Sequence, residues 1–237
     1  MNTKNQRYDS APRRQNTRDA PVSLLNEAQR FEFMNILRSH NPSPQPELKF
    51  RNPFELLCAV LLSAQCTDAA VNKATPALFA AAPDAQALCA LSTEQIASYI
   101  RSLGLWQAKS RYLKELAVTL SRDFKGAVPA DFDLLTSLPG VGPKTALVVL
   151  NVAFGRDTIA VDTHIFRLCQ RSGLCLGKNA LQVQQRLPAL IDDEFKRHAH
   201  HWLLLHGRYV CKARTPDCAH CAVKSLCVTG SGRTAHS

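Results

Sequence analysis

Four cysteines near the C-terminus have the residue type and spacing of a metal site. Six, two and five residues separate them in turn, and they are Cys211, Cys218, Cys221 and Cys227. Thiolates are ligands of both structural zinc and iron–sulfur clusters. The surrounding segment has little apolar material of its own that could pack a core. The spacing therefore predicts a metal site, and by itself it leaves zinc and an iron–sulfur cluster open.

A lysine follows a glycine-rich turn near the middle of the chain. Residues 138–146 read Leu-Pro-Gly-Val-Gly-Pro-Lys-Thr-Ala between two apolar helical patterns. Glycine permits positive φ and a close approach of the backbone to a ligand, and we expect the amides of this turn to point outward. The next helix would present unpaired N–H groups and the positive end of its dipole, a combination that binds phosphate. The alternative is a tight helical hairpin that only packs.

Lys144 and Asp162 are the two candidates for catalysis. Lys144 falls in the first turn of the second helix, where the dipole and partial burial favour a neutral, nucleophilic amine. A lysine that only contacts phosphate is equally compatible with the residues themselves. Asp162 ends an apolar segment and precedes another helical pattern, so it is a candidate N-cap. A carboxylate held at a helix start is also rigidly placed for chemistry, and the two roles are compatible.

Taken together, these motifs resemble the endonuclease III family of helix-hairpin-helix DNA glycosylases. The resemblance rests on residues 138–144, on Val-Asp-Thr-His at residues 161–164, and on the four cysteines in order. It covers nearly the whole chain after Ser23. It implies a base excision repair enzyme, a bifunctional DNA glycosylase and AP lyase. Its partner would be double-stranded DNA that contains damaged bases or abasic sites, and its substrates would be oxidised pyrimidines.

The resemblance also implies the roles of the two candidate catalytic residues. Lys144 would be the amine nucleophile that attacks C1′ of the damaged nucleotide and displaces the base. The resulting Schiff base makes the neighbouring C–H more acidic, so that β-elimination can release the 3′ phosphate. Asp162 would assist departure of the base and stabilise the cationic sugar.

Rotation of the target nucleotide out of the duplex is a further implication of the resemblance. In the family, residues matching Gln65, Leu105 and His164 fill or wedge the gap that is left. From the residues alone, Leu105 could belong to the core, Gln65 could cap a helix and His164 could be an ordinary first-turn residue. Two positions depart from the family pattern: Pro143, where a basic residue is common, and Cys66 beside Gln65. We expect these departures to weaken affinity for the DNA backbone at most.

The resemblance assigns the backbone contacts and the cofactor as well. Gly140, Val141 and Gly142 of the hairpin would bind the DNA backbone. The four cysteines would hold a 4Fe-4S cluster rather than zinc. The cluster loop would then place Lys212 and Arg214 against phosphates, a positioning role rather than a catalytic one.

Two other functions stay open from the residues. An adenine-mismatch glycosylase without lyase activity shares the cluster loop, but it normally carries a long C-terminal recognition domain, whereas this chain ends ten residues after Cys227. A noncatalytic DNA-binding module with a structural metal is favoured if Lys144 contacts only phosphate. Replacement of Lys144 separates the lyase from both alternatives.

Charge and cysteine usage fit an intracellular DNA-binding protein. The formal net charge is +10, which favours polyanionic partners. An odd number of cysteines, nine, suits a reducing compartment. The longest apolar run, residues 54–64, contains Glu55 and is too short to span a bilayer. We expect a soluble monomer with no membrane contact. It would be cytoplasmic and nucleoid-associated in a bacterium, or nuclear or mitochondrial in a eukaryote.

The candidate functional residues are expected to lie on or between helices. Apolar residues recur along the sequence with helical periodicity, and no run of alternating strand residues is present. The fold class is therefore predicted to be all-α. Pro76 and Pro188 should kink or shorten two helices, Ser92 begins a capping-box pattern, and Gly104 and Gly155 are expected as left-handed C-caps. The expected helices cover residues 23–40, 54–64, 68–81, 93–103, 108–124, 132–138, 144–154, 163–171, 179–191 and 194–206.

The predicted architecture has two helical lobes that flank a DNA-binding cleft. Residues 1–22 form a basic tail that we expect to be disordered. One lobe, residues 47–156, carries the helix-hairpin-helix. The other combines residues 23–46 with residues 157–237 and carries the iron–sulfur loop, so the chain leaves this lobe and returns to it. The candidate lysine and aspartate would face each other across the cleft.

Overall fold

The computed structural model describes residues 22–232 of the chain. Across these residues it contains eleven α-helices, one short 3-10 helix and no strand, which confirms the all-α prediction. None of the described helices is long and apolar enough to cross a membrane. Apart from Val22, the basic tail expected at residues 1–22 lies outside the described residues.

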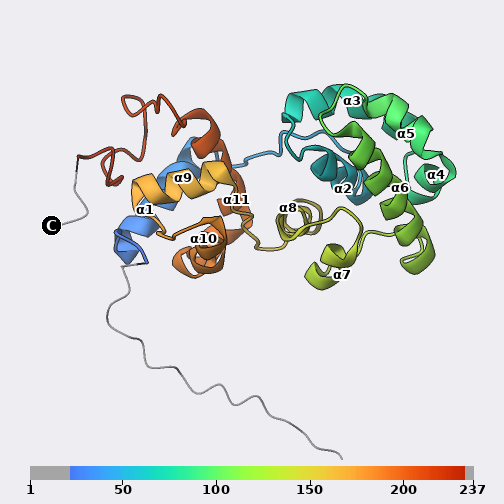
Figure 1. The fold of residues 1–237 in the computed structure, drawn as a ribbon. Coiled ribbons are helices and arrows are strands. Elements are labelled where there is room, and N and C mark those ends of the chain that lie inside the picture. The colour runs from blue at the N-terminus through green and yellow to red at the C-terminus, as the bar shows by residue number, and fades with distance from the viewer. Residues whose placement is uncertain (1–21, 233–237) are drawn as a thin grey trace, which may run out of the picture.

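The helices follow one another with short connections (Figure 1). In chain order they are α1 (Glu27–His40), α2 (Pro53–Leu62), α3 (Asp68–Ala81), α4 (Ala85–Ala90), α5 (Thr93–Ile100), α6 (Trp106–Asp123), α7 (Phe132–Ser137), α8 (Pro143–Phe154), α9 (Thr163–Ser172), α10 (Ala180–Arg186), the 3-10 helix η1 (Leu187–Leu190) and α11 (Asp193–Tyr209).

Local signals in the sequence account for several helix ends. Ser92 and Gln95 form the expected capping box at the start of α5. Pro143 is the first residue of α8, and Gly155 ends that helix in the left-handed conformation with φ 66°. The expected helix at 179–191 is divided: α10 ends at Arg186, and the segment that contains Pro188 continues as η1. These ends depend only on neighbouring residues, which is why the sequence predicts them.

The sequence analysis missed one helix and misplaced one cap. The six-residue helix α4 was not expected, because it is too short to show a period. Helix α3 continues through the exposed Pro76 to Ala81, so this proline does not shorten it. Gly104 is not left-handed; the next residue, Leu105, has φ 59° instead.

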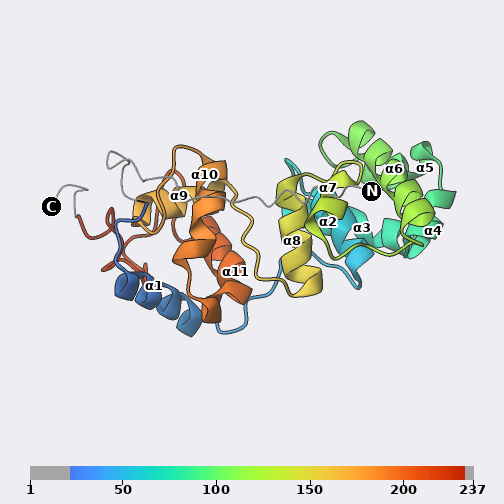
Figure 2. The same cartoon turned by 90° about the horizontal axis from the view of Figure 1, so that it is seen from below.

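Buried apolar side chains form two separate clusters. The first core is made by α2 to α8, with members from Phe54 to Leu150. The second core is made by α1, α9, α10 and α11, with members from Leu25 to Leu37 and from Ile159 to Val223. Figure 1 shows the two groups of helices side by side, and Figure 2 shows α8 as the helix of the first group that lies nearest to α11. The chain crosses between the groups twice, before α2 and after α8.

Polar contacts join the two cores at both crossings. The amide nitrogen of Asn151 in α8, which is fully buried, donates to the carbonyls of Thr158 and of Arg197 in α11, at 3.1 and 3.2 Å. At the other crossing, Arg208 of α11 pairs with Glu47 and with Asp68, the first residue of α3, the latter at 2.6 Å. These contacts set the position of α8 and α3 relative to α11.

Candidate active site

A pocket of about 230 Å³ lies where α8, α2 and α11 meet between the two cores. It contains three of the residues that the sequence predicts as functional: Lys144, Asp162 and Gln65. Lys144 lies on α8, which packs in the first core, and Asp162 lies at the start of α9, which packs in the second. The structure therefore brings together two candidate catalytic residues that belong to different halves of the molecule.

Lys144 is the second residue of α8, directly after Pro143. Its side chain is exposed, so the expectation of partial burial is wrong. It lies in the first helical turn and lines the pocket from there. No side chain caps the start of α8, because the N-cap residue is Gly142. The positive end of the helix dipole is therefore open to an anion beside the lysine amine.

The hairpin before α8 needs glycine at one position and leaves space at another. Gly140 has φ +74°, and a Cβ there would lie 2.9 Å from Cβ of Tyr112. A Cβ at Gly142 would meet nothing within 4 Å, which leaves room for a ligand to approach the backbone. Val141 differs, because its side chain is buried and its N–H donates to the Leu138 carbonyl at 3.1 Å. The expectation of outward-pointing amides is thus wrong at Val141, which closes the turn.

Asp162 is the N-cap of α9, as the sequence predicts. Its Oδ1 accepts from the N–H groups of His164 and Ile165, at 2.9 and 2.8 Å. Among the described residues, its Oδ2 accepts no hydrogen bond. One carboxylate oxygen is therefore used to fix the side chain, and the other is free for chemistry in the pocket.

Gln65 and Leu105 share an uncommon backbone conformation. Both have positive φ, 57° and 59°, and Lys125 is the only other non-glycine residue of the described chain with this property. Leu105 is also 57% exposed, so it is not a core residue. Gln65 is not a cap, since Ser63 ends α2 and Thr67 begins α3. A left-handed residue with a Cβ costs about 1–2 kcal/mol, which the surrounding structure must offset.

The loops that carry Gln65 and Leu105 lie against each other. A Cβ at Gly104 would be 3.9 Å from Sγ of Cys66 and 4.0 Å from the Gln65 carbonyl oxygen. Lys109 of α6 is almost fully buried, and its amine donates to the same sulfur at 3.1 Å. Cys66, one of the two departures from the family pattern, therefore helps to tie the two loops together.

His164 lies in the first turn of α9, where α9 packs closely against α11. A Cβ at Gly207 would meet the His164 carbonyl oxygen at 2.7 Å, so only glycine fits there. Nδ1 of His164 lies 3.3 Å from Nη2 of Arg167. Arg167 also donates to the carbonyls of Gly207 and Cys211, at 2.6 and 2.9 Å. His164 is therefore held next to the cysteine loop and does not line the pocket of Lys144.

All four cysteines of the C-terminal loop line a second pocket. Burial raises the pKa of Cys221 and of Cys227, and the charges of the neighbouring thiolates raise both pKa values further. A cationic metal centre would relieve this repulsion, so the donor set fits a thiolate-bound cluster. Within residues 22–232, no group of three or more potential ligands is positioned to hold a single metal ion. The ligand set therefore stays a prediction.

Two arginines of α9 hold the cysteine loop. Arg171 donates to the carbonyls of Lys212 and Ala213, at 2.6 and 2.8 Å, and Arg167 donates to that of Cys211. The side chains of Lys212 and Arg214 are exposed, away from the pocket that contains Lys144. The loop thus presents basic side chains to solvent, while α9 fixes its backbone.

Two histidines of α11 line the Lys144 pocket although the sequence analysis did not single them out. They are His200 and His201, 3% and 7% exposed. Burial lowers the pKa of His200 to about 3 and that of His201 to about 4. Both imidazoles are therefore neutral at pH 7. Their position on the apolar face of the expected helix 194–206 was the available signal, and it is also typical of an ordinary core histidine.

Comparisons with known proteins agree on one family. Residues 58–192 match the family model described as "HhH-GPD superfamily base excision DNA repair protein". The chain is 49% identical to endonuclease III of Escherichia coli strain K12 over 203 residues, which is 86% of this chain and 96% of that protein. It is 52% identical to endonuclease III of Treponema pallidum over 191 residues, which is 81% of this chain and 90% of that protein.

A solved structure gives the same result for the fold. It is a trapped endonuclease III–DNA covalent intermediate, and its TM-score with this chain is 0.82 at 42% identity. The match covers 89% of this chain and 99% of that chain.

The capping role of Asp162 can be measured by itself. In Asp162→Ala, two N–H groups of α9 lose their acceptor, and we expect the free energy of unfolding in urea to fall by about 1 kcal/mol. Asp162→Asn keeps an oxygen at the position of Oδ1 and should retain most of the stability. If the alanine variant were as stable as the wild type, the two hydrogen bonds would contribute nothing to folding.

Proposed function

The chain belongs to the endonuclease III family of the HhH-GPD superfamily of base excision DNA repair proteins, and we propose that it excises oxidised pyrimidines from duplex DNA through Lys144 and Asp162. Proteins of this family are bifunctional DNA glycosylases and AP lyases, so the reaction also nicks the strand at the abasic site. The observation that carries the proposal is the presence of the exposed Lys144 amine and the free Asp162 oxygen in one pocket.

Lys144 is the nucleophile of the proposed reaction. Its amine attacks C1′ of the damaged nucleotide, and the bond from C1′ to the base breaks, with the electron pair leaving on the base. The sugar opens to a Schiff base on the lysine. Loss of a proton from the neighbouring carbon then expels the 3′ phosphate, which cuts the strand. The open start of α8 binds an adjacent phosphate and so aligns the strand for attack.

Asp162 supports both steps through its free oxygen. The cap bonds to His164 and Ile165 fix the carboxylate, so it does not have to be ordered when DNA binds. A negative charge at this place stabilises the positive charge that develops on the sugar as the base departs. We infer that the same oxygen accepts a proton from the attacking amine.

The remaining DNA contacts follow from the surfaces around the pocket. Gly140 and Gly142 offer the DNA backbone their amides, while Val141 keeps the hairpin closed. Gln65 and Leu105 project from their two strained loops into the space that the rotated nucleotide leaves. His164, which does not line the pocket, completes this wedge on the side of the second core.

We propose a 4Fe-4S cluster bound by Cys211, Cys218, Cys221 and Cys227. The family carries such a cluster, and four thiols that line one pocket fit it. When bound, the cluster supplies no reactive ligand position and serves to hold the loop. Lys212 and Arg214 are thereby presented to DNA phosphates.

We also propose that the protein has two lobes, in agreement with its two cores. One lobe is residues 47–156, and the other combines residues 23–46 with residues 157–237.

Borohydride trapping tests the nucleophile. The protein is incubated with a duplex that bears one oxidised pyrimidine, and sodium borohydride reduces any Schiff base to a stable adduct. We expect an adduct with the wild type and none with Lys144→Gln. Lys144→Arg keeps the positive charge for phosphate and should also give none. Lys178→Gln, which removes another exposed lysine, should trap like the wild type. An adduct with Lys144→Gln would show that Lys144 is not the nucleophile.

Leu105→Gly should separate stability from activity. Glycine adopts positive φ at no cost, so we expect the free energy of unfolding to be unchanged or about 1 kcal/mol higher, which is a rise in Tm of about 2–4 °C. Excision of a base from duplex DNA should nevertheless fall, because the wedge is lost. Lys125→Gly relieves the same strain at another site and should leave excision unchanged. A Leu105→Gly variant that excises bases at the wild-type rate would show that the strained leucine has no part in base flipping.

Metal analysis tests the cofactor. We expect about four iron atoms and four sulfides per chain in the purified protein. Cys221→Ser should lower the iron content and expose the loop to proteolysis. A protein that instead holds one zinc atom per chain would contradict the cluster.

A further inference from the structure

His200 of α11 is a buried polar residue in the pocket, and its Nδ1 has no hydrogen-bond partner among the described residues. Its side chain is 3% exposed and lines the same pocket as Lys144 and Asp162. A buried polar atom without a hydrogen bond destabilises a fold, and such atoms are uncommon. The neighbouring His201 shares this property, since its Nδ1 also lacks a hydrogen-bond partner among the described residues.

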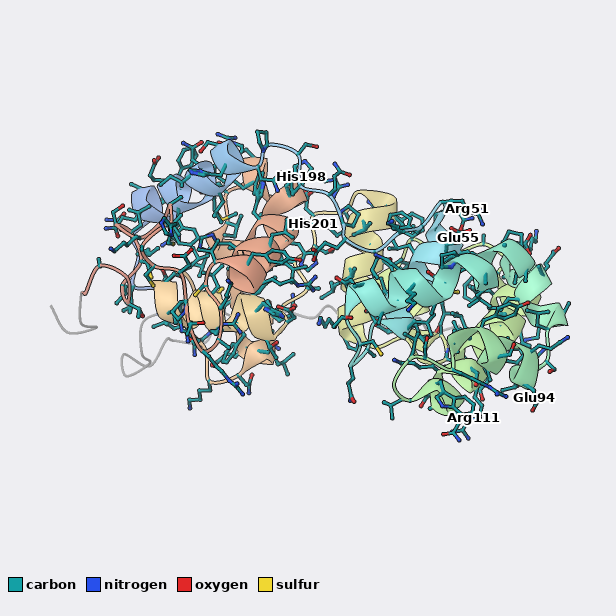
Figure 3. All side chains as sticks on the ribbon, turned by 90° about the horizontal axis from the view of Figure 1, so that it is seen from above. Arg51, Glu55, Glu94, Arg111, His198 and His201 are labelled. Atoms are coloured by element: carbon teal, nitrogen blue, oxygen red, sulfur yellow. The ribbon has the colours of Figure 1, made fainter. Side chains whose placement is uncertain are left out.

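His200 and the neighbouring His201 differ in the charges that act on them. Burial lowers the pKa of His200, and the charges of His201, Lys144 and Arg208 lower it further. The pKa of His201 is lowered, after burial, by Arg197 and His198 on its own helix. Figure 3 shows His198 and His201 on α11. Both imidazoles line the pocket that contains Lys144, and the charge of Lys144 acts on His200.

The position of the proton on His200 follows from the empty site at Nδ1. A neutral imidazole carries one N–H and one lone pair. A buried lone pair without a partner is tolerated more often than a buried N–H without one. The lone pair therefore belongs on Nδ1 and the proton on Nε2, which is the nitrogen at the tip of the ring. The tip is the part of the side chain that can reach a molecule in the pocket.

A neutral donor suits the base that leaves. When the bond to C1′ breaks, the base takes the electron pair, and the negative charge spreads onto the ring carbonyl oxygens of a pyrimidine. A donor aimed at such an oxygen stabilises the charge as it develops. A histidine that stays neutral adds no positive charge beside Lys144 and needs no proton from solvent.

We propose that Nε2–H of His200 donates a hydrogen bond to a carbonyl oxygen of the extruded pyrimidine and stabilises the departing base. His200 is then a catalytic residue of base excision, with a preference for bases that carry a ring carbonyl next to the glycosidic nitrogen. This role rests on the proposed function, because it requires the damaged base in the Lys144 pocket. It has no part in the later lyase step, in which the base has already left.

The difference between the two steps gives the test. Single-turnover base excision is measured on a duplex with one oxidised pyrimidine, and strand nicking is measured on a duplex with a preformed abasic site. His200→Phe and His200→Leu remove the donor, with two different volumes. We expect either variant to lose about 10- to 100-fold in excision and to stay within about twofold of the wild type in nicking. His200→Gln places an amide nitrogen near the position of Nε2 and should recover much of the excision rate.

The controls separate this inference from the proposed function. His198→Phe changes a histidine of the same helix outside the pocket and keeps its ring contact with Trp202, so both rates should be unchanged. Wild-type excision by His200→Phe and His200→Leu, or equal losses of excision and nicking in both, would overturn the role of His200 alone. A wild-type protein that neither excises the base nor forms the borohydride adduct would instead overturn the proposed function.

Discussion

The side chain of Asn151 is the contact on which the geometry of the pocket depends. Its amide nitrogen donates to the carbonyls of Arg156, Thr158 and Arg197, at 3.0, 3.1 and 3.2 Å. The first two belong to the segment that leads from α8 toward Asp162, and the third belongs to α11. One fully buried side chain thus fixes α8, the crossing segment and α11 together. Because Lys144 lies in the first turn of α8 and Asp162 ends the crossing segment, their separation is set by a residue that contacts neither of them.

The loops that carry Gln65 and Leu105 have conformations that lower the stability of the fold. Gln65 and Leu105 are left-handed without being glycine, and Leu105 also exposes an apolar side chain. Neither feature helps folding. The close contact of the loops through Gly104 and Cys66, with the Lys109 amine on the cysteine sulfur, holds them in this conformation. Strain that is maintained by a dedicated set of contacts is typical of a site that must present a side chain to a partner.

The sequence predicted those features that depend on neighbouring residues. Apolar periodicity located most helices, and the caps at Ser92 and Asp162 were identified from single residues and their spacing. Features that depend on distant contacts were missed or wrong. Leu105 rather than Gly104 is left-handed, because the packing of two loops decides the conformation there. His200 could not be told from a core histidine, since its missing hydrogen-bond partner is visible only when the whole pocket is known. The family resemblance supplied roles that no local pattern contains.

Helix α9 connects the carboxylate of the pocket to the cysteine loop. Asp162 caps its first turn, and Arg167 and Arg171 on the same helix hold the loop backbone at Cys211 and Lys212. The helix is ten residues long and packs closely on α11 at Gly207, which holds its first turn independently of the cysteine loop. Without the proposed metal, the loop would release the arginines at one end of this helix while the cap at the other end stayed intact. The position of Asp162 therefore depends first on its own cap and the α9–α11 contact, and the proposed cluster would act mainly on the basic surface that lies outside the pocket.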